Sequence, residues 1–421
     1  MAATDTETRQ AIEAVFRIEQ ARLIAGLARM TRDMGLAEEL AQDAVVAALS
    51  EWPQTGIPNN PGAWLMAVAK RRAIDGFRRN ATFERKQAEL VRDVEDGHDP
   101  GFEDVEAAVD DDVGDELLGL IFTACHPVLS TEARAALTLR LIGGLTTEEI
   151  ARAFLSTEST IAQRIVRAKR TLGNAGLTFE VPRGNEREER LASVLEVVYL
   201  IFNEGYAATA GEDLIRPTLC AEALRLGRVL AGLTPDEPEV FGLLALMEIQ
   251  ASRLRARTAP DGSPVLITEQ NRARWDRLLI RRGLAALERA EALGGANGPY
   301  ALQAAIAACH ARARTADETD WERISALYDT LGEVMPSPVV ELNRAVAHSM
   351  AFGPEAGLKL VDEIAQAAVL RNYAPLPAAR GDFLYRAGRP AEARVHFERA
   401  AGLSRNEREK AFLLGRAAAC G

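Results

Sequence analysis

A strongly acidic segment divides this chain and limits how it can fold. Residues 93–116 contain twelve Asp or Glu and no Lys or Arg. Basic residues concentrate on either side: residues 70–86 hold seven Lys or Arg against two acids, and residues 140–170 hold six against three. A segment with so much like charge cannot bury itself in a core. The chain is therefore expected to form separate modules joined by an acidic linker.

Composition favours helices for these modules. Hydrophobic residues make up 48% of the 421 residues, whereas aromatic residues make up only 5%. Ala, Leu, Arg and Glu dominate, and they favour helices over strands. Apolar residues recur at helical spacing, and no strand pattern of substance is found. We expect an all-α fold in which two small helical domains, the second a helix-turn-helix, precede a helical C-terminal domain.

Several kinds of protein are excluded by what the sequence lacks. No window approaches the roughly 18 apolar residues of a membrane span, and the first 17 residues have no apolar signal-peptide core. A cytoplasmic protein is therefore expected. The cysteines lie far apart, so no disulfide framework, metal site or other cofactor is expected. The pairs Cys125-His126 and Cys309-His310 are expected to pack rather than to bind metal.

The most specific motif lies in residues 144–170. Thr146 and Glu149 have the spacing of a capping box at the start of one helix. Ser156 and Thr157 can then form the turn and the cap of a second helix. Ile161, Ile165 and Ala168 would line the buried side of this second helix. The motif therefore predicts a helix-turn-helix.

The exposed side of that second helix carries polar groups suited to DNA. The residues left exposed are Thr160, Gln163, Arg164 and Arg167. Gln suits adenine and Arg suits guanine through paired hydrogen bonds in the major groove. An ordinary solvated helix pair is the alternative, but the cap, the turn and the exposed Arg and Gln together favour DNA binding.

The N-terminal part has its own helical pattern. Apolar residues recur over 8–31 and over 36–51, and the second of these helices is expected to end at Trp52-Pro53. Residues 53–61 are rich in Pro, Gly and Asn and predict a loop. A third helix is expected from about Pro61 to Arg79. Its basic residues recur at helical spacing and share a broad face that could follow the phosphates of melted DNA.

Together these motifs resemble the extracytoplasmic-function (ECF) sigma factors of bacterial RNA polymerase. Residues 144–170 are similar to their promoter −35 reading region, although Leu155 stands where many members have glycine, so the turn is expected to differ. The segment Ala37-Glu38-Glu39-Leu40-Ala41-Gln42-Asp43-Ala44 is similar to the part that grips the polymerase. The segment Pro61-Gly62-Ala63-Trp64-Leu65 is similar to the start of the −10 reading helix.

The resemblance implies a role for each set of residues. Contacts with the −35 element are expected from Thr160, Gln163, Arg164, Arg167 and Lys169. Contacts with the −10 element are expected from Asn59, Asn60, Arg71, Arg72, Arg78 and Arg79. A flipped base in the loop could find hydrogen-bond partners in Gln54, Thr55, Asn59 and Asn60. Contacts with core RNA polymerase are expected from Asp33, Glu38, Glu39, Gln42 and Asp43. Trp64 is expected to lie in the core rather than to stack on a base.

The second half of the chain is expected to be an added helical domain. A helix opens after a turn at Gly353-Pro354-Glu355-Ala356, and another does so 35 residues later at Gly388-Arg389-Pro390-Ala391-Glu392-Ala393. This spacing is typical of tetratricopeptide repeat (TPR) stacking and predicts a TPR-like domain. Phe122-Thr123-Ala124-Cys125-His126-Pro127 and Tyr199-Leu200-Ile201-Phe202-Asn203-Glu204-Gly205-Tyr206 resemble an ECF subgroup with such an extension. Asn203-Glu204-Gly205-Tyr206 is expected to be a helix-end motif rather than part of a site.

These observations give an expected domain order and function. The expected ranges are 1–81 for sigma region 2, 82–115 for the acidic linker, 116–178 for sigma region 4, 179–300 for the middle segment and 301–421 for the TPR-like repeats. The expected function is promoter recognition with core RNA polymerase, under regulation by a protein or ligand on the extension. The alternative is a helix-turn-helix regulator with a TPR sensor that works without polymerase. An enzyme is not expected, because no nucleophile–base pair or phosphate loop is found.

Overall fold

The structure is a computed structural model that describes residues 2–89, 113–177, 179–208 and 211–421. The side chains of residues 2–7 and 79–89 lie outside this description. Contacts divide the chain into two compact units, residues 1–152 with 156–197 and residues 153–155 with 198–421. The described parts are helical and contain no β-strand, which confirms the all-α prediction. None of the helices in these ranges is long and apolar enough to cross a membrane.

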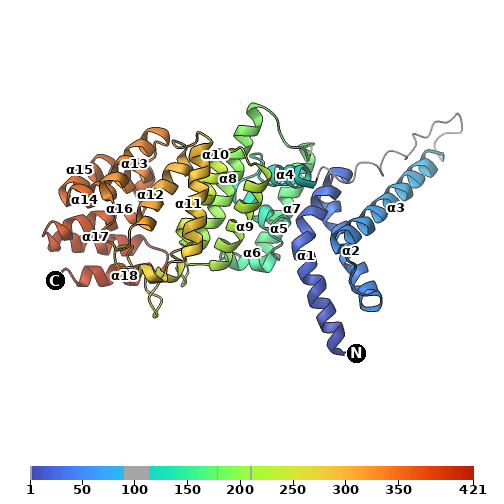
Figure 1. The fold of residues 1–421 in the computed structure, drawn as a ribbon, viewed down its shortest axis with the longest axis horizontal. Coiled ribbons are helices and arrows are strands. Elements are labelled where there is room, and N and C mark those ends of the chain that lie inside the picture. The colour runs from blue at the N-terminus through green and yellow to red at the C-terminus, as the bar shows by residue number, and fades with distance from the viewer. Residues whose placement is uncertain (1, 90–112, 178, 209–210) are drawn as a thin grey trace. The chain divides into compact units, whose positions relative to one another are not determined.

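The described residues of the first unit form seven helices and the beginning of an eighth (Figure 1). Their bounds are α1 Ala2–Thr31, α2 Met34–Thr55, α3 Pro61–Glu89, α4 Val113–Ala124, α5 Thr131–Leu141, α6 Thr147–Ala153, α7 Glu158–Asn174 and α8 Asn185–Tyr206. Helix α1 packs against α2, α3 and α4, and α5 packs against α7. The apolar stripe of α1 supplies much of this core through Leu23, Ile24 and Leu27, which are fully buried.

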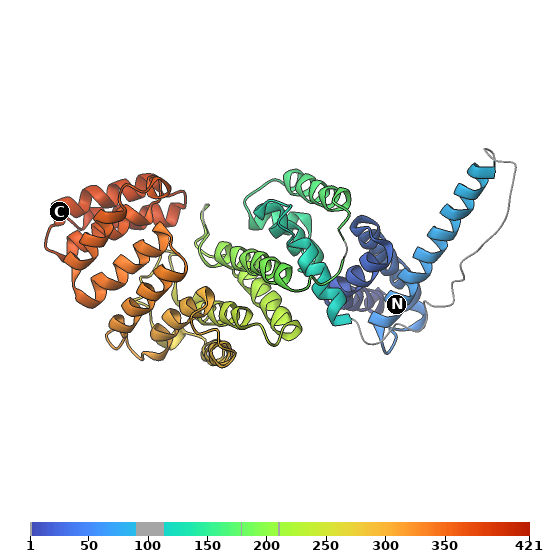
Figure 2. The same ribbon diagram turned by 90° about the horizontal axis from the view of Figure 1, so that it is seen from above.

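Two helices of this unit run further than the sequence pattern predicts. Helix α2 contains Pro53 and ends at Thr55, where Gly56 has a φ of 83° and donates its N–H to the Trp52 carbonyl at 2.9 Å. The glycine, and not the proline, therefore ends this helix. Helix α3 continues past Arg79 to Glu89, and its C-terminal half projects beyond α1 and α2 (Figures 1 and 2). Residues 84–89 are mostly Glu, Arg, Lys, Gln and Ala, which favour helix without burial.

The start of α8 is anchored to α4 and α5 within the first unit. Arg134 on α5 is buried and donates to Ser193 and, at 3.1 Å, to Glu196 on α8. Ser193 in turn donates to the Cys125 carbonyl at 2.6 Å. Arg190 donates to the Phe122 carbonyl at 2.8 Å. The segment that begins at Phe122 therefore meets α8 through its backbone carbonyls.

The second unit is a series of consecutive helices that lie side by side (Figure 1). Their bounds are α9 Pro217–Leu233, α10 Pro238–Ala251, α11 Arg277–Ala292, α12 Pro299–Arg312, α13 Trp321–Val334, α14 Pro338–Phe352, α15 Pro354–Ile364, α16 Pro375–Arg386, α17 Pro390–Leu403 and α18 Glu407–Ala418. Short 3-10 helices occupy Leu254–Ala256, Arg272–Arg274 and Ala368–Leu370.

The two motifs that suggested a repeat lie in the helix pairs α14–α15 and α16–α17. Gly353 and Gly388 both have positive φ, 97° and 75°, in the turns that precede α15 and α17. Each pair also packs closely at a small residue. Gly357 on α15 faces Ser349 on α14, and Gly381 on α16 faces Phe397 on α17. The pairs share one apolar core that includes Leu358, Phe383 and Phe397.

Substituting one of these close-packed glycines tests the packing. In Gly357→Ala the added Cβ would lie 2.5 Å from Ser349 Cβ and 2.9 Å from Phe383 Cε2. We expect the free energy of unfolding to fall by about 1–3 kcal/mol. Gly415→Ala is the matched control, because Gly415 is exposed in α18 with nothing within 4 Å of an added Cβ. At this position alanine should raise the free energy of unfolding by up to about 1 kcal/mol, because alanine favours a helix more than glycine does. Chemical denaturation that gave both variants the same change would contradict the packing.

Candidate nucleic-acid interface

The helix-turn-helix forms as its caps predict. Thr146 N–H donates to the Glu149 carboxylate at 2.8 Å, and Glu149 N–H donates to Thr146 Oγ1 at 3.1 Å, so the capping box at α6 is confirmed. Thr157 caps α7 by accepting from the N–H of Thr160 at 3.2 Å. Leu155, in the turn, has a φ of 47°, within the left-handed region that favours glycine. The backbone here therefore keeps a glycine-like conformation although a leucine occupies the position.

Helix α7 separates an apolar face from a polar one. Ile161, Ile165, Ala168 and Leu172 are buried. Four of the five residues expected to read the −35 element lie together on a groove of about 330 Å³. They are Thr160, Gln163, Arg164 and Arg167. The other wall comes from the N-terminal end of α5 and the residues before it, including Val128 and Ser130.

Ser130 is a residue that the sequence analysis did not single out. Its hydroxyl accepts from the N–H of Ala133 at 3.4 Å and caps α5. The N-terminus of α5 therefore lies on the same groove as Arg164 and Arg167. A helix N-terminus and two guanidinium groups all favour a negatively charged ligand such as a phosphate backbone. The Ser-Thr-Glu start of α5 was a detectable capping signal, but its position beside α7 was not.

Lys169, the fifth expected −35 residue, lies apart from this groove. Its ammonium group pairs with the Glu38 carboxylate on α2. Arg140 on α5 donates to the other oxygen of the same carboxylate at 2.9 Å. Glu38 is 7% exposed. Burial alone would raise the pKa of Glu38, but the hydrogen bonds and charges of Lys169 and Arg140 outweigh it and hold this pKa below its usual value.

The remaining residues expected to bind polymerase occupy α2 and its cap. Asp33 caps the helix by accepting from the N–H groups of Gly35 and Leu36 at 2.7 and 3.0 Å. Glu39 and Gln42 are exposed. Asp43 pairs with Arg72 on α3 at 3.0 Å. The structure thus leaves Glu39 and Gln42 open to a partner, whereas Glu38 is held inside the unit. The polymerase-binding role of all five residues stays a prediction.

The residues expected to contact the −10 element lie on α3 and the loop before it. Asn60 caps α3 by accepting from the N–H of Ala63 at 3.1 Å, while Asn59 is exposed. Arg71 and Arg78 are exposed, and the side chain of Arg79 lies outside the described residues. Trp64 is half-buried and packs edge-on against the buried Trp52, with ring centroids 5.3 Å apart; its core role stays a prediction.

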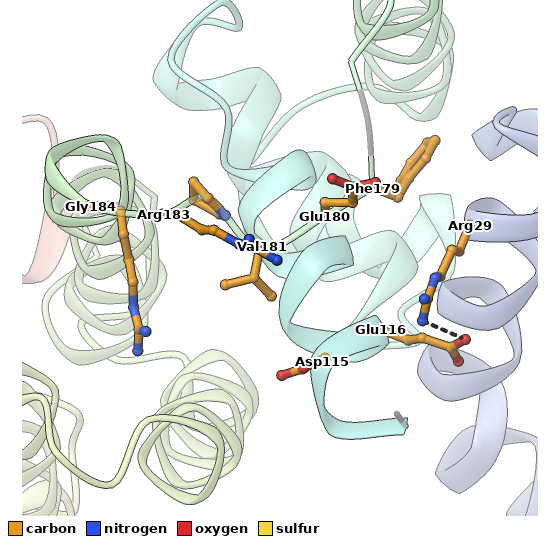
Figure 3. Close-up of a pocket in the computed structure, with 10 residues that line it drawn as sticks. Arg29, Asp115, Glu116, Phe179, Glu180, Val181, Arg183 and Gly184 are labelled. Atoms are coloured by element: carbon orange, nitrogen blue, oxygen red, sulfur yellow. Dashed lines mark hydrogen bonds and ion pairs between the residues drawn. The ribbon is translucent and has the colours of Figure 1, made fainter. Parts of the chain in front are cut away.

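A separate polar cavity of about 670 Å³ lies elsewhere in the first unit. Arg29 and Glu116 form an ion pair at 3.5 Å on one side of it, and Figure 3 shows Phe179 and Glu180 nearby. Its lining mixes cations such as Arg29 and Arg183 with acids such as Asp115. Because both signs of charge are present, this cavity does not form a phosphate-binding surface.

The two Cys-His pairs show no metal cluster. Among the described side chains no group of three or more His, Cys, Asp or Glu could hold a metal ion. Burial raises the pKa of the Cys125 thiol to about 11, although its hydrogen bond with Thr138 and the charges of two arginines lower it. Cys125 is therefore a protonated packing residue at neutral pH.

Comparison with known families identifies the modules. Residues 15–83 match the family "Sigma-70 region 2", and residues 120–172 match "Sigma-70, region 4". Residues 190–291 match a "Family of unknown function (DUF6596)". The chain is 42% identical over 394 residues to "Uncharacterized protein R00370" of Rhizobium meliloti (strain 1021), covering 93% of this chain and 91% of that protein. It is 29% identical over 163 residues to "ECF RNA polymerase sigma factor SigK" of Mycobacterium ulcerans (strain Agy99), covering 36% of this chain and 79% of that protein.

Two helical modules, one with a helix-turn-helix whose reading face is polar, define a DNA-binding protein. With the two sigma-70 matches, the chain belongs to the sigma-70 family: it is a sigma factor with an additional helical C-terminal domain. The family membership supports binding to RNA polymerase and promoter DNA. Sigma-factor families are not enzymes, which supports the expectation that this chain performs no covalent chemistry.

The buried carboxylate of Glu38 gives a stability prediction. Glu38→Gln should lower the free energy of unfolding by about 1–3 kcal/mol at pH 7, because it removes charge-assisted hydrogen bonds to Lys169 and Arg140. Since the folded-state pKa of Glu38 lies below its ordinary 4.5, this stabilisation is present above that value. It should be lost as the pH falls through the lower folded-state pKa.

The control for this measurement is Glu39→Gln. Glu39 is the exposed neighbour of Glu38 on α2, so its substitution should change stability by no more than about 0.5 kcal/mol. Denaturation curves at pH 7 and at decreasing pH measure both variants. If Glu38→Gln were no more destabilising than Glu39→Gln, the buried ion-pair cluster would not hold α2 against α5 and α7.

Proposed function

We propose that this chain is an ECF-type initiation factor that reads a promoter with two separate surfaces while it is bound to core RNA polymerase. The observation that best supports this proposal is the groove on α7. There Gln163, Arg164 and Arg167 share one wall while the opposite face of the helix is fully buried. Such an arrangement suits base reading in the major groove of the −35 element. The similarity to a relative named as an ECF sigma factor supports the ECF type.

The second surface is formed by α3 and the loop before it. Asn59 is exposed in the loop, and Arg71 and Arg78 are exposed on the helix. Melted DNA offers phosphates to the arginines and an unstacked base to the loop. We therefore assign recognition of the −10 element to this surface. Because Asn60 caps α3, its amide oxygen fixes the loop, and its N–H₂ group is the part that remains for a base.

Chain length allows both surfaces to act on one promoter. Glu89 ends α3 and Val113 begins α4, 24 residues later. At about 3.3 Å per residue this connection can reach at most about 80 Å. Two turns of DNA measure about 70 Å. The acidic composition of the connection does not suit phosphates, and it instead suits the basic RNA channel of polymerase. A solvated spacer is the simpler alternative.

Binding to core polymerase would change the first unit. Glu38 is expected to contact polymerase and Lys169 is expected to contact DNA, yet the two side chains pair with each other in the free chain. Both cannot meet their partners while they stay paired. We therefore infer that α2 and α7 separate when the factor engages polymerase. Such a factor acts where the polymerase is, in the cytoplasm. The C-terminal helices are assigned a regulatory role toward a protein or a ligand.

Run-off transcription with purified core polymerase tests this function. The full chain should direct transcripts to defined start sites, and Arg164→Ala should weaken discrimination at the −35 element by about 1–3 kcal/mol, the value of a bidentate base contact. The charge-matched control is Arg282→Ala, an exposed arginine on α11, which should leave discrimination unchanged.

Two results would count against the proposal. Core polymerase that gains no start-site selectivity from the chain would refute the initiation function and favour a polymerase-independent regulator. If Arg164→Ala reduced transcription equally from promoters with unrelated −35 sequences, Arg164 would be a phosphate contact rather than a base-reading residue.

A further inference from the structure

A cluster of arginines and aromatic rings lies within the C-terminal unit. It brings together the end of α8, the segment after α10, and α12. We call it the Arg253 cluster. Its members are Tyr206, Arg253, Arg257, Arg272, Trp275 and His310. Tyr206, Arg272 and Trp275 are 8%, 8% and 3% exposed, whereas Arg253, Arg257 and His310 are half-buried. The cluster therefore has a buried floor and a side that solvent can reach.

The guanidinium groups pack around the two rings. Arg257 Cζ lies 3.7 Å from the centre of the Tyr206 ring, and Arg253 Cζ lies 5.8 Å from it. On the Trp275 ring, the Cζ atoms of Arg253 and Arg272 lie 5.7 and 4.9 Å from the centre. Arg253 also donates to the Tyr206 hydroxyl at 2.6 Å. Three positive charges thus share one small volume.

These charges lack a close ion-pair partner in the part of the chain that the structure describes, although the charge of Glu318 acts on Arg272 from farther away. Among the described residues, none of the three arginines has an acidic side chain within ion-pair distance. Elsewhere in the same unit, arginines do pair: Arg216 binds Glu204, and Arg228 binds Glu248 at 2.8 Å. Contacts with aromatic faces offset only part of the cost of removing a guanidinium group from water. A group of like charges without a close counter-charge is a feature that a bound anion would stabilise.

Several polar atoms of the cluster are buried without a hydrogen-bond partner. They are Nε of Arg257, Nε of Arg272, Nε1 of Trp275 and Nδ1 of His310. Such atoms are rare in folded proteins, because each one loses its hydrogen bond to water. The other nitrogens of Arg272 are occupied by the carbonyls of His310 and Ala313 and by Thr319. Arg272 is therefore a positioning residue. Arg253 uses one terminal nitrogen for Tyr206 and Gln250, which leaves its Nε and its other terminal nitrogen for a ligand. The guanidinium group of Arg257 contacts the Tyr206 ring and has no hydrogen bond to a described residue.

His310 is neutral in this setting. Burial, together with the charges of Arg253 and Arg272, lowers the pKa of His310 to about 3. At physiological pH its ring therefore adds no charge, and Nδ1 can either donate or accept a hydrogen bond. The positive charge of the cluster comes from the arginines alone and does not change with pH in the physiological range.

We propose that the Arg253 cluster binds a small oxyanion-bearing ligand, a carboxylate or a phosphate, and that Arg253 and Arg257 bind its oxygens. Guanidinium groups bind both kinds of anion through paired hydrogen bonds. Trp275 Nε1 and His310 Nδ1 supply further hydrogen bonds from the floor of the site, and Tyr206 forms an aromatic wall. A small ligand suits a site whose floor is this deeply buried. The site needs neither DNA nor polymerase, so its test is separate from that of the initiation function.

Isothermal titration calorimetry on the full-length chain tests the proposal. The probes are sodium phosphate and sodium citrate, each compared with sodium chloride at equal ionic strength. We expect saturable binding of at least one probe, and we expect Arg253→Gln and Arg257→Gln to weaken it at least tenfold. Arg255→Gln is the matched control, because Arg255 is exposed on the short 3-10 helix that Arg253 and Arg257 flank, and this variant should bind the probe as the unsubstituted chain does. Phosphate binding alone would identify a phosphoryl ligand, and citrate binding alone a carboxylate.

A second measurement separates a ligand site from a structural cluster. Without ligand, Arg257→Gln should melt at the same temperature as the unsubstituted chain or higher, because it removes an uncompensated charge. Arg228→Gln, which breaks the ion pair with buried Glu248, should melt lower. The proposal fails if neither probe binds saturably, if binding survives in Arg257→Gln, or if Arg257→Gln melts as low as Arg228→Gln. Binding of an acidic peptide but of neither small probe would also overturn it, in favour of a protein-docking surface.

Discussion

The ion-pair cluster around Glu38 is the most deeply buried polar contact described between the two sigma modules, which also meet where α1 packs against α4. One buried carboxylate on α2 accepts from Arg140 on α5 and pairs with Lys169 on α7, which lie 102 and 131 residues away in sequence. A buried carboxylate is tolerated only when cations and hydrogen bonds replace its water. Region 2 therefore supplies the buried carboxylate, and region 4 supplies the two cations that stabilise it. The same contact occupies one side chain expected to meet polymerase and one expected to meet DNA.

Charge segregation explains how an acidic chain can bind DNA. The net charge of −11 would repel DNA if it were spread evenly. Instead, Arg164 and Arg167 share a groove with the N-terminus of α5, while exposed Arg71 and Arg78 lie on α3. The C-terminal unit adds a third concentration of positive charge in the Arg253 cluster, but there the charges are largely enclosed. Local surfaces, and not the total charge, therefore decide which anions this protein meets.

Much of the fold was predictable because it rests on local signals. The capping box of Thr146 and Glu149, the Thr157 cap and the apolar stripe of α7 are short-range patterns, and each appears where expected. The position of Lys169 was also open to prediction. Five residues after Arg164, at about 100° per residue, it falls well away from the reading face. The length of α3 was missed because helix propensity, and not apolar periodicity, governs its last turns.

The rest could not be predicted because it depends on distant contacts. Nothing in the local sequence pairs Glu38 with Arg140 and Lys169, or places Ser130 beside Arg164. The Arg253 cluster joins Tyr206 to His310 across 104 positions, and within the sequence each is an ordinary helical residue. A structural role was expected for Asn203-Glu204-Gly205-Tyr206. Gly205 has such a role, because a Cβ at this position would lie 2.7 Å from the Cys220 backbone. Tyr206, next to it, instead lines the proposed site.

The distance between α2 and α7 tests the central claim most directly. Val46 and Val166 are 57% and 65% exposed, and the four native cysteines are buried, so Val46→Cys and Val166→Cys can be spin-labelled selectively. Pulsed electron paramagnetic resonance should give one short distance for the free chain. A longer distance should replace it when core polymerase is added. An unchanged distance in a complex that initiates transcription would contradict the account, because Glu38 and Lys169 would then remain paired during function.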